Sequence, residues 1–376
     1  MAGPAAASVR GGGGPFENPW PTWTGDKRLA DVWAFSREMR ALGAPNWGHL
    51  AANRRPTLQD MRAAFPLHAP DYAALASPAP GAVTALWAGH AAVFVQIEGL
   101  NLLTDPMLAE RASPIPFLGP RRAVPASISP EDPHLPRLDA VLISHNHYDH
   151  LCGASVAALH RRYGDGLEWY VPLGLAAWFR ARGIANVTEL GWWEERQHPG
   201  SKVRLVLTPA QHWSARGVLD ARRTLWGGWA VVGEAQRFWF AGDTGYCPVF
   251  KEIGARLGPF DLAAIPIGAY EPRAFMQPQH INPEEAVAVH KEVRARHSLA
   301  IHYGTFHLTL EPLDEPPARL ATAAAAAGLG ADEFVALQHG AMLTVRGGYV
   351  VCGSSFCRVL LPCTGSNAWR YSTARR

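Results

Sequence analysis

The chain is short of charged residues, of cysteine and of long apolar runs. Only 18% of its 376 residues are charged, below the roughly 25% of ordinary soluble domains. The net charge of +3 without a Lys/Arg cluster excludes a typical nucleic-acid-binding protein. No run approaches the roughly 18 consecutive apolar residues of a membrane-spanning helix, so a soluble or peripheral protein is expected. Five scattered cysteines exclude a dense disulfide framework and favour a reducing compartment.

Hydrophobic residues, by contrast, are abundant. They make up 48% of the chain, and 14 of them are tryptophans. This composition suits a protein that keeps apolar surface for a ligand or a membrane, and a tryptophan-rich core is the alternative. The first 14 residues are rich in Ala and Gly and lack the apolar centre of a secretory signal. We interpret them as a disordered tail, with an organelle transit peptide as the alternative.

The remaining chain divides into three parts. Residues 15–80 read as a covering segment with a helix at 27–42, residues 81–344 as a catalytic domain, and residues 345–376 as a divergent tail that lacks acidic residues. Short strands are predicted at 83–88, 92–98 and 101–104, before a proline-rich loop over residues 105–136. Strands and helices then alternate, which indicates a layered α/β architecture. The predicted strands are 139–144, 169–171, 203–208, 228–233, 237–241, 262–266 and 298–301, and the predicted helices are 153–163, 174–182, 283–296 and 316–327.

The clearest chemical signal follows the predicted strand 139–144 directly. Within six residues the chain presents His145, His147, Asp149 and His150. Neutral imidazoles and carboxylates are the ligands that zinc accepts, and imidazoles crowded this closely would depress one another's pKa unless a cation used them. A polar turn explains any single histidine, but it does not explain the whole pattern. We therefore predict a metal site at this loop.

The four residues of one loop cannot complete the coordination of two metal ions, so further ligands are expected after later strands. His212, Asp243 and His302 each follow a predicted strand. We predict that one zinc ion is held by His145, His147 and His212. The other is held by Asp149, His150 and His302, and Asp243 bridges the two, because a carboxylate has two oxygens to offer.

Four nearby residues receive more limited predictions. Cys152 and Cys247 flank predicted ligands, and we expect both to be buried thiols. His90 and Asp105 either orient the ligands from behind or serve only in packing.

The motif and its spaced partners resemble the metallo-β-lactamase fold superfamily. Within it, the chain is similar to the N-acyl-phosphatidylethanolamine-hydrolysing phospholipases D over about residues 87–320. The resemblance implies a four-layer αββα sandwich with two Zn²⁺ ions at the seven residues above, and it implies that His280 lies near the reacting phosphate. An N-terminal position on a surface helix is the alternative for His280. The segments that carry the resemblance are Arg111-Ala112-Ser113-Pro114, Gly119-Pro120, residues 142–151, Trp192-Trp193-Glu194-Glu195, Gln211-His212-Trp213, residues 240–248, residues 258–280, Pro283-Glu284-Glu285-Ala286 and Ile301-His302-Tyr303-Gly304-Thr305.

The activity implied by this resemblance is hydrolysis of a phosphodiester in N-acyl-phosphatidylethanolamine. The products would be an N-acylethanolamine and phosphatidic acid, formed by attack of a metal-bound hydroxide on phosphorus. Asp243 or Asp149 would orient the attacking oxygen and take up its proton, while His280 would stabilise the phosphate or assist the departing alcohol. Apolar residues near the ligands are candidates to line a lipid cleft, although core packing explains each singly; they are Trp213, Trp226, Trp229, Tyr270, Phe275 and Met276.

Two other functions stay open on the sequence. The first is another hydrolase of this fold, such as a lactonase, thioesterase or nuclease, and the second is a non-catalytic zinc-containing lipid-binding protein. For the favoured function we expect a phospholipid at a membrane surface as partner, no nucleic acid, and a homodimer as a candidate assembly. Arg111, Arg121 and Arg122 are candidates to meet lipid phosphates, with simple solvation as the alternative. We expect a cytoplasmic protein bound peripherally to internal membranes.

Overall fold

The computed structural model describes residues 14–25, 29–42, 58–115, 117–217, 219–351, 358–361 and 370–373. The predicted disordered tail, residues 1–14, therefore lies outside the described residues except for Gly14. The predicted boundaries of the three later parts stay predictions, but the first sheet includes strands on both sides of residue 344.

Eight strands form the first sheet, in the order β15–β14–β1–β2–β3–β4–β5–β6. Strands β14, β1, β2 and β3 form an antiparallel meander, and β3 to β6 run parallel. The strand bounds are β1 Val83–Gly89, β2 Ala92–Ile97, β3 Leu100–Thr104, β4 Ala140–Leu142, β5 Glu168–Pro172, β6 Val187–Leu190, β14 Met342–Arg346 and β15 Tyr349–Val350.

The second sheet repeats this plan with seven strands, in the order β13–β12–β11–β10–β9–β8–β7. Strands β7 to β10 are antiparallel, and β10 to β13 are parallel. The strand bounds are β7 Glu195–Gln197, β8 Arg204–Thr208, β9 Gly228–Val232, β10 Arg237–Phe240, β11 Phe260–Pro266, β12 Ala295–Ile301 and β13 Phe334–Val335. A separate hairpin joins β16 Arg358–Leu361 to β17 Arg370–Thr373.

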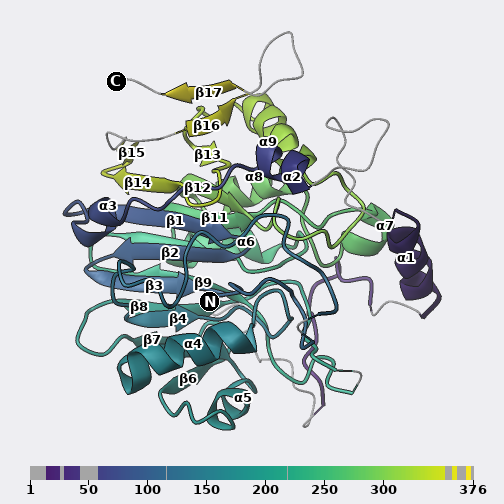
Figure 1. The fold of residues 1–376 in the computed structure, drawn as a ribbon, viewed down its shortest axis with the longest axis horizontal. Helices are drawn as coiled ribbons and strands as arrows, with labels where there is room; N and C mark the ends of the chain where they lie inside the picture. The colour runs from purple at the N-terminus through teal and green to yellow at the C-terminus, as the bar shows by residue number, and fades with distance from the viewer. Residues whose placement is uncertain are drawn as a thin grey trace.

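Helices cover the outer face of each sheet (Figure 1). Helices α4 (Gly153–Tyr163) and α5 (Ala176–Arg180) pack on the first sheet, where Leu159 and Phe179 join the outward-facing Phe94 in one apolar cluster. On the second sheet, α8 (Pro283–Glu292) packs against β11 and β12 and is flanked by α6 (Val249–Leu257) and α9 (Glu315–Ala326). The predicted four-layer αββα sandwich is therefore confirmed.

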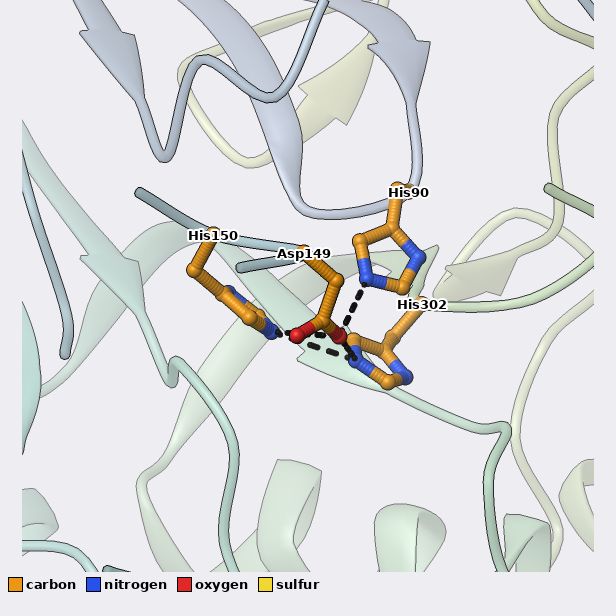
Figure 2. A group of neighbouring side chains, drawn as sticks. All are labelled: His90, Asp149, His150 and His302. Atoms are coloured by element: carbon orange, nitrogen blue, oxygen red, sulfur yellow. Dashed lines mark hydrogen bonds and ion pairs between the residues drawn. The ribbon is translucent and has the colours of Figure 1, made fainter. Parts of the chain in front are cut away.

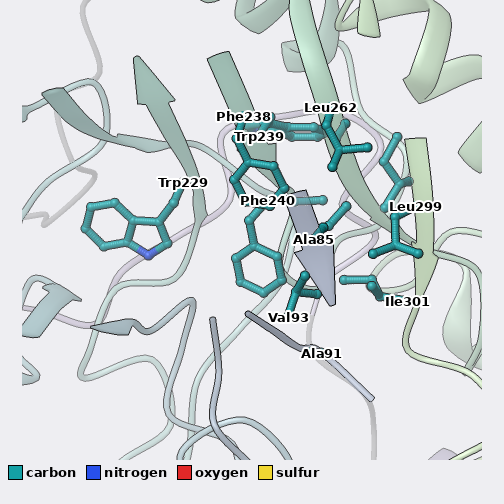
Figure 3. Close-up of a cluster of buried hydrophobic side chains, with 14 of the residues drawn as sticks. Ala85, Ala91, Val93, Trp229, Phe238, Trp239, Phe240, Leu262, Leu299 and Ile301 are labelled. Atoms are coloured by element: carbon teal, nitrogen blue, oxygen red, sulfur yellow. The ribbon is translucent and has the colours of Figure 1, made fainter. Parts of the chain in front are cut away.

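The main core lies between the two sheets. Alternate residues of each strand point into it: Ala85 and Val93 face the second sheet, whereas their neighbours Leu86 and Phe94 face the outer helices. Figure 3 shows Phe240 of the opposite sheet among the side chains that meet there. Every strand residue of β1 and β2 is buried, as expected for a sheet covered on both faces.

Most predicted elements are present with small shifts in their bounds. Helix α4 has the predicted bounds, and α1 (Leu29–Leu42) lies within the predicted helix of the covering segment, which also contains α2 (Leu58–Ala64) and α3 (Tyr72–Ala76). Helix 283–296 was predicted too long, because Arg294 adopts φ +61° and β12 begins at Ala295. Strand pairing with β11 overrides the helical propensity there. The elements α6, α7 (Arg273–Met276), β6, β7 and β13–β15 were not predicted.

Within the described ranges, no helix combines the length and the apolarity needed to cross a bilayer.

The position of Phe240 gives a test of the inter-sheet core. We expect Phe240→Ala to lower the free energy of unfolding by about 3–5 kcal/mol, because the ring is fully buried and its removal leaves a cavity. Phe117→Ala is the matched control, since that ring is 82% exposed and its loss should cost under about 0.5 kcal/mol. Urea denaturation followed by tryptophan fluorescence measures both. Equal effects of the two substitutions would contradict this assignment of the core.

Candidate metal centre

The predicted site residues meet at one edge of the sandwich. The loop with His145, His147, Asp149 and His150 leaves β4 directly, and the other predicted ligands leave β8, β10 and β12. Because these strand ends lie at the same edge, side chains from distant parts of the chain converge there. The structure brings together all seven predicted ligands, and it adds His90 from the turn between β1 and β2.

A first group consists of three imidazoles. The Nδ1 atom of His147 lies 2.9 Å from Nε2 of His145 and 3.3 Å from Nε2 of His212. All three rings are buried or nearly so. Potential ligand atoms of these residues all lie within 4.8 Å of one another.

Hydrogen bonds from behind determine which nitrogen of each ring faces this group. The hydroxyl of Ser144 donates to Asp105 (2.5 Å) and therefore accepts from Nδ1–H of His145 (2.9 Å). Likewise Nδ1–H of His212 donates to the Gln279 carbonyl (3.0 Å). The Nε2 atoms of His145 and His212 are then left unprotonated, and they face His147 with their lone pairs. Such an arrangement is repulsive unless a cation or a proton lies among the nitrogens.

A second group combines Asp149 with three imidazoles (Figure 2). Oδ2 of Asp149 lies 3.0 Å from Nε2 of His90, 3.4 Å from Nε2 of His150 and 3.5 Å from Nε2 of His302. His150 is oriented by Asp105, which accepts from its Nδ1–H at 2.6 Å. His90 and His302 both have left-handed backbones, with φ +57° and +63°, and the His302 amide donates to the His90 carbonyl. This strained pair of turns holds the two rings 4.0 Å apart between centroids.

Asp243 lies between the two groups. Its Oδ2 is 3.1 Å from Nε2 of His150, 3.8 Å from Nε2 of His212 and 4.0 Å from Nε2 of His145, and its Oδ1 is 3.2 Å from Nε2 of His302. The preceding Gly242 has φ +62°, and a side chain there would collide with Ser144. Glycine thus lets the loop after β10 approach the loop after β4.

Buried side chains fix the loops that carry these groups. The indole of Trp229 donates to the Ile143 carbonyl at the start of the histidine loop (2.8 Å), and the indole of Trp226 donates to the Ala210 carbonyl just before His212 (2.8 Å). Nη1 of Arg216 donates to the carbonyls of Asn146 and Leu151, at 2.8 Å each, and so spans the histidine loop. These bonds restrict the motion of the ligands before any metal binds.

The electrostatics divide the histidines into two kinds. Burial, reinforced by neighbouring histidines, lowers the pKa of His147 to about 3, and burial lowers that of His212 to about 4. Burial also disfavours the charged form of His302, but attraction to Asp243 outweighs it and raises the pKa to about 9. The same competition raises the pKa of His150 well above its usual value. Without a metal, the carboxylates therefore draw protons onto two of the imidazoles.

This donor set fits a metal ion. Imidazole lone pairs and carboxylate oxygens face one another without enough protons to satisfy them, and the buried Asp105 and Asp243 and the largely buried Asp149 supply the carboxylate oxygens. A cation would replace the protons on His150 and His302 and relieve the repulsion within the first group. Orientation of the ligating rings by a carboxylate and a carbonyl is typical of protein metal sites.

A cleft of about 820 Å³ opens over this edge. His147, Asp149, His212 and Asp243 lie at its base, and His280 joins them with Nδ1 4.0 Å from Oδ2 of Asp243. Burial, despite attraction to Asp243, lowers the pKa of His280 well below its usual value, so the ring is neutral. Apolar side chains form much of the wall; they include Trp23, Val32, Phe35, Trp213, Phe275 and Met276.

Several predicted lipid contacts are placed elsewhere by the fold. Tyr270 is fully buried outside the cleft, with its hydroxyl bonded to Glu315, and Trp226 and Trp229 are core residues. Their closeness in sequence to the ligands reflects a role in packing under the loops. Trp213, Phe275 and Met276 do line the cleft.

Of the three loop arginines predicted as candidate lipid contacts, the structure rules out Arg122. Arg122 is only 6% exposed, donates to the carbonyls of Met107 and Ala109, and stacks on Phe306, so it does not reach a lipid phosphate. Arg121 pairs with Glu110 at the surface, and Arg111 donates to the Gly119 carbonyl.

Other sequence predictions agree with the structure. Cys152 and Cys247 are both buried thiols, as predicted. Asp105 orients ligand side chains, which was one of its two open roles. Nε2 of His90 lies 3.0 Å from Oδ2 of Asp149. The only sequence signal for this role was the position of His90 between two predicted strands.

The fold and the site together define a metal-dependent hydrolase. The family model described as "Beta-lactamase superfamily domain" matches residues 100–303. The solved structure of Igni18, a metallo hydrolase from Ignicoccus hospitalis, superimposes with a TM-score of 0.54 at 21% identity, covering 70% of this chain and 99% of that one. That likeness supports the fold.

Two relatives narrow the class. The chain is 50% identical over 244 residues to N-acyl-phosphatidylethanolamine-hydrolyzing phospholipase D 1 of Caenorhabditis elegans, covering 61% of this chain and 68% of the relative. It is 36% identical over 244 residues to the mitochondrial N-acyl-phosphatidylethanolamine-hydrolyzing phospholipase D of Saccharomyces cerevisiae, covering 62% of this chain and half of the relative. The chain therefore belongs to the beta-lactamase superfamily and, within it, to the family of N-acyl-phosphatidylethanolamine-hydrolysing phospholipases D.

The raised pKa values predict how metal binding depends on pH. A metal must displace the protons of His150 and His302. His302 keeps its proton below its pKa of about 9, and the pKa of His150 is also raised well above its usual value. We therefore expect zinc affinity to rise with pH between about 6 and 8, by roughly ten-fold per pH unit for each proton displaced. Titration calorimetry in buffers of different ionisation enthalpy measures the protons released. An affinity that stays constant over this range would contradict the assigned protonation.

Proposed function

We propose that the protein hydrolyses N-acyl-phosphatidylethanolamine to an N-acylethanolamine and phosphatidic acid, with two zinc ions as cofactors. The observation that carries this proposal is the position of the imidazole and carboxylate groups at the base of a cleft with apolar walls. A phospholipid needs both features, because its phosphodiester is charged and its chains are apolar. The names of the two relatives supply the substrate.

In this proposal the two groups hold one ion each. His145, His147 and His212 hold the first, and Asp149, His150 and His302 hold the second, with Asp243 between them. Zinc accepts this mixture of imidazole and carboxylate ligands. When bound, zinc lowers the pKa of water towards 7 and polarises phosphoryl oxygens. His90 contacts Asp149 and serves to hold that carboxylate in place.

The side chains at the base of the cleft then divide the remaining work. Asp149 and Asp243 are acceptors for the proton of the attacking water, and Asp149 is the more accessible, at 16% against 3% of the side chain. His280 is neutral, and its Nδ1 has no hydrogen-bond partner among the residues that the structure describes. From the edge of the cleft it donates a hydrogen bond to a phosphoryl oxygen or to the departing alcohol oxygen.

The apolar wall provides the place for acyl chains. Phe35 of α1 stacks on Phe275 of α7, with ring centroids 4.9 Å apart and planes within 6°. Trp213 packs edge-on against His147, with centroids 4.5 Å apart. These rings bring an apolar surface directly up to the polar base, so that the scissile phosphodiester and the chains are held together.

The rim of the cleft favours docking on a membrane surface. Trp33, beside the cleft-lining Val32, is 70% exposed, and Leu219, between the cleft-lining Gly217 and Ala221, is 92% exposed. Apolar side chains this exposed, next in the chain to residues that line a cleft, suit insertion among lipid headgroups. A substrate could then pass from the bilayer into the cleft without crossing water.

A direct assay tests the reaction. The full chain, loaded with zinc, is incubated with N-acyl-phosphatidylethanolamine and, separately, with phosphatidylcholine, a lactone and RNA. We expect release of the N-acylethanolamine, and we expect Asp149→Asn and His212→Ala to lower kcat by at least about 100-fold and to reduce bound zinc. Mass spectrometry of the lipid products and elemental analysis of the protein measure the two effects.

The exposed His134 provides the control for these variants. His134→Ala removes an exposed imidazole that is not among the residues lining the cleft, and it should leave zinc content and turnover unchanged. Normal turnover in Asp149→Asn or His212→Ala would refute the proposed site. Cleavage of the lactone or RNA in preference to the phospholipid would refute the proposed substrate.

Vesicle binding tests the role of the rim. We expect the double variant Trp33→Ser/Leu219→Ser to bind phospholipid vesicles at least about ten-fold more weakly, because two apolar side chains no longer leave water. Tyr349→Ser is the control, since this 77% exposed ring lies on β15, away from α1 (Figure 1). Co-sedimentation measures the bound fraction. An equal loss in both variants would show that the rim has no special role.

A further inference from the structure

The segment before α1 contacts the metal centre directly. We call residues 14–25 the N-terminal strap. Phe16 donates its backbone N–H to the Arg222 carbonyl (2.8 Å), and Trp20 packs against Trp192 with ring centroids 5.5 Å apart and planes tilted by 33°. Farther along, Trp23 and Gly25 line the cleft. The strap therefore crosses the loop that carries His212 and continues into the wall above it.

Asn18 makes the central contact of the strap. Its Nδ2 donates to the His212 carbonyl at 2.8 Å, and its Oδ1 accepts from the His212 backbone N–H at 3.2 Å. One primary amide thus satisfies both backbone groups of a single residue, 194 positions away in the chain. Thr22 continues the contact, because its hydroxyl donates to Oε1 of Gln211 at 2.5 Å.

These bonds complete the restraint of one ligand. The His212 ring is oriented by its bond to the Gln279 carbonyl, and the preceding Gln211 forms an isolated bridge to Gly245, but His212 itself belongs to no strand or bridge of the described structure. The Asn18 amide instead pairs with the backbone N–H and carbonyl of His212. Asn18 fixes the backbone of His212, and the Gln279 carbonyl fixes Nδ1 of its ring. The Nε2 atom of His212 therefore points towards His147 and Asp243.

We infer that Asn18 is a positioning residue for the metal centre, acting through His212. The inference rests on the proposed metal site, but it does not depend on the identity of the substrate. Asn18 lies outside residues 100–303, which the superfamily model covers. The N-terminal strap is thereby a working part of the hydrolase site, beyond its role in covering the core.

Zinc affinity of the full chain tests this inference without any substrate. We expect Asn18→Ala to weaken zinc binding by about 10–100-fold, the effect usual for a group that orients a ligand from behind. Asn18→Asp keeps the shape and the acceptor but places a carboxylate oxygen against the His212 carbonyl, so it should weaken binding as well. Competition with a chromophoric chelator measures the dissociation constants. Glu17→Ala is the control, because Glu17 is the exposed neighbour in the same strap.

A second comparison separates positioning from a general loss of stability. In a His212→Ala background the side chain that Asn18 positions is gone, so adding Asn18→Ala should not change the zinc affinity that remains. A further loss of similar size in that background would overturn the inference, as would affinities within two-fold of the unmodified chain in both Asn18 variants. If the unmodified chain binds no zinc, the proposed function falls together with this inference.

Discussion

The mutual repulsion of buried lone pairs governs this protein's site. Nε2 of His145 and of His212 face Nδ1 of His147, and hydrogen bonds behind the first two rings prevent them from turning away. The carboxylates beside them, Asp149 and Asp243, lie at the base of the cleft, where little of either side chain is exposed. The three imidazoles are stable only with a proton or a cation among their nitrogens, and the carboxylates only with protons on His150 and His302 or with a metal ion beside them.

The sandwich fold brings the ends of β4, β8, β10 and β12 to one edge and holds them there. The central strands of each sheet, such as β2 and β9, are buried on both faces, so they have little freedom to shift. Trp226 and Trp229 have two roles. Their rings fill the core, and their indole N–H groups donate hydrogen bonds to backbone carbonyls just before His212 and His145. The tryptophans of the chain serve both purposes: Trp87, Trp169 and Trp239 are fully buried in the core, whereas Trp23 and Trp213 line the cleft.

The covering segment joins the polar and apolar halves of the site. It supplies Asn18 to the backbone of a ligand, and it supplies Trp23 and Phe35 to the cleft wall. A substrate with a charged phosphodiester and long chains needs both halves in fixed relation. The N-terminal strap, residues 14–25, contributes to both halves, and α1 contributes to the apolar one.

The sequence alone determined the layered α/β class, the helix α4 and the histidine loop, because these depend on residues within a few positions of one another. It also indicated His212, Asp243 and His302, since each follows a strand with a clear apolar pattern. Only the tertiary structure decided the contacts of His90 and Asn18, whose partners lie 59 and 194 residues away. It likewise ended α8 at Glu292 and put Tyr270 outside the cleft. Local patterns record which face of an element is apolar, whereas the distance between two elements is set by how their faces pack.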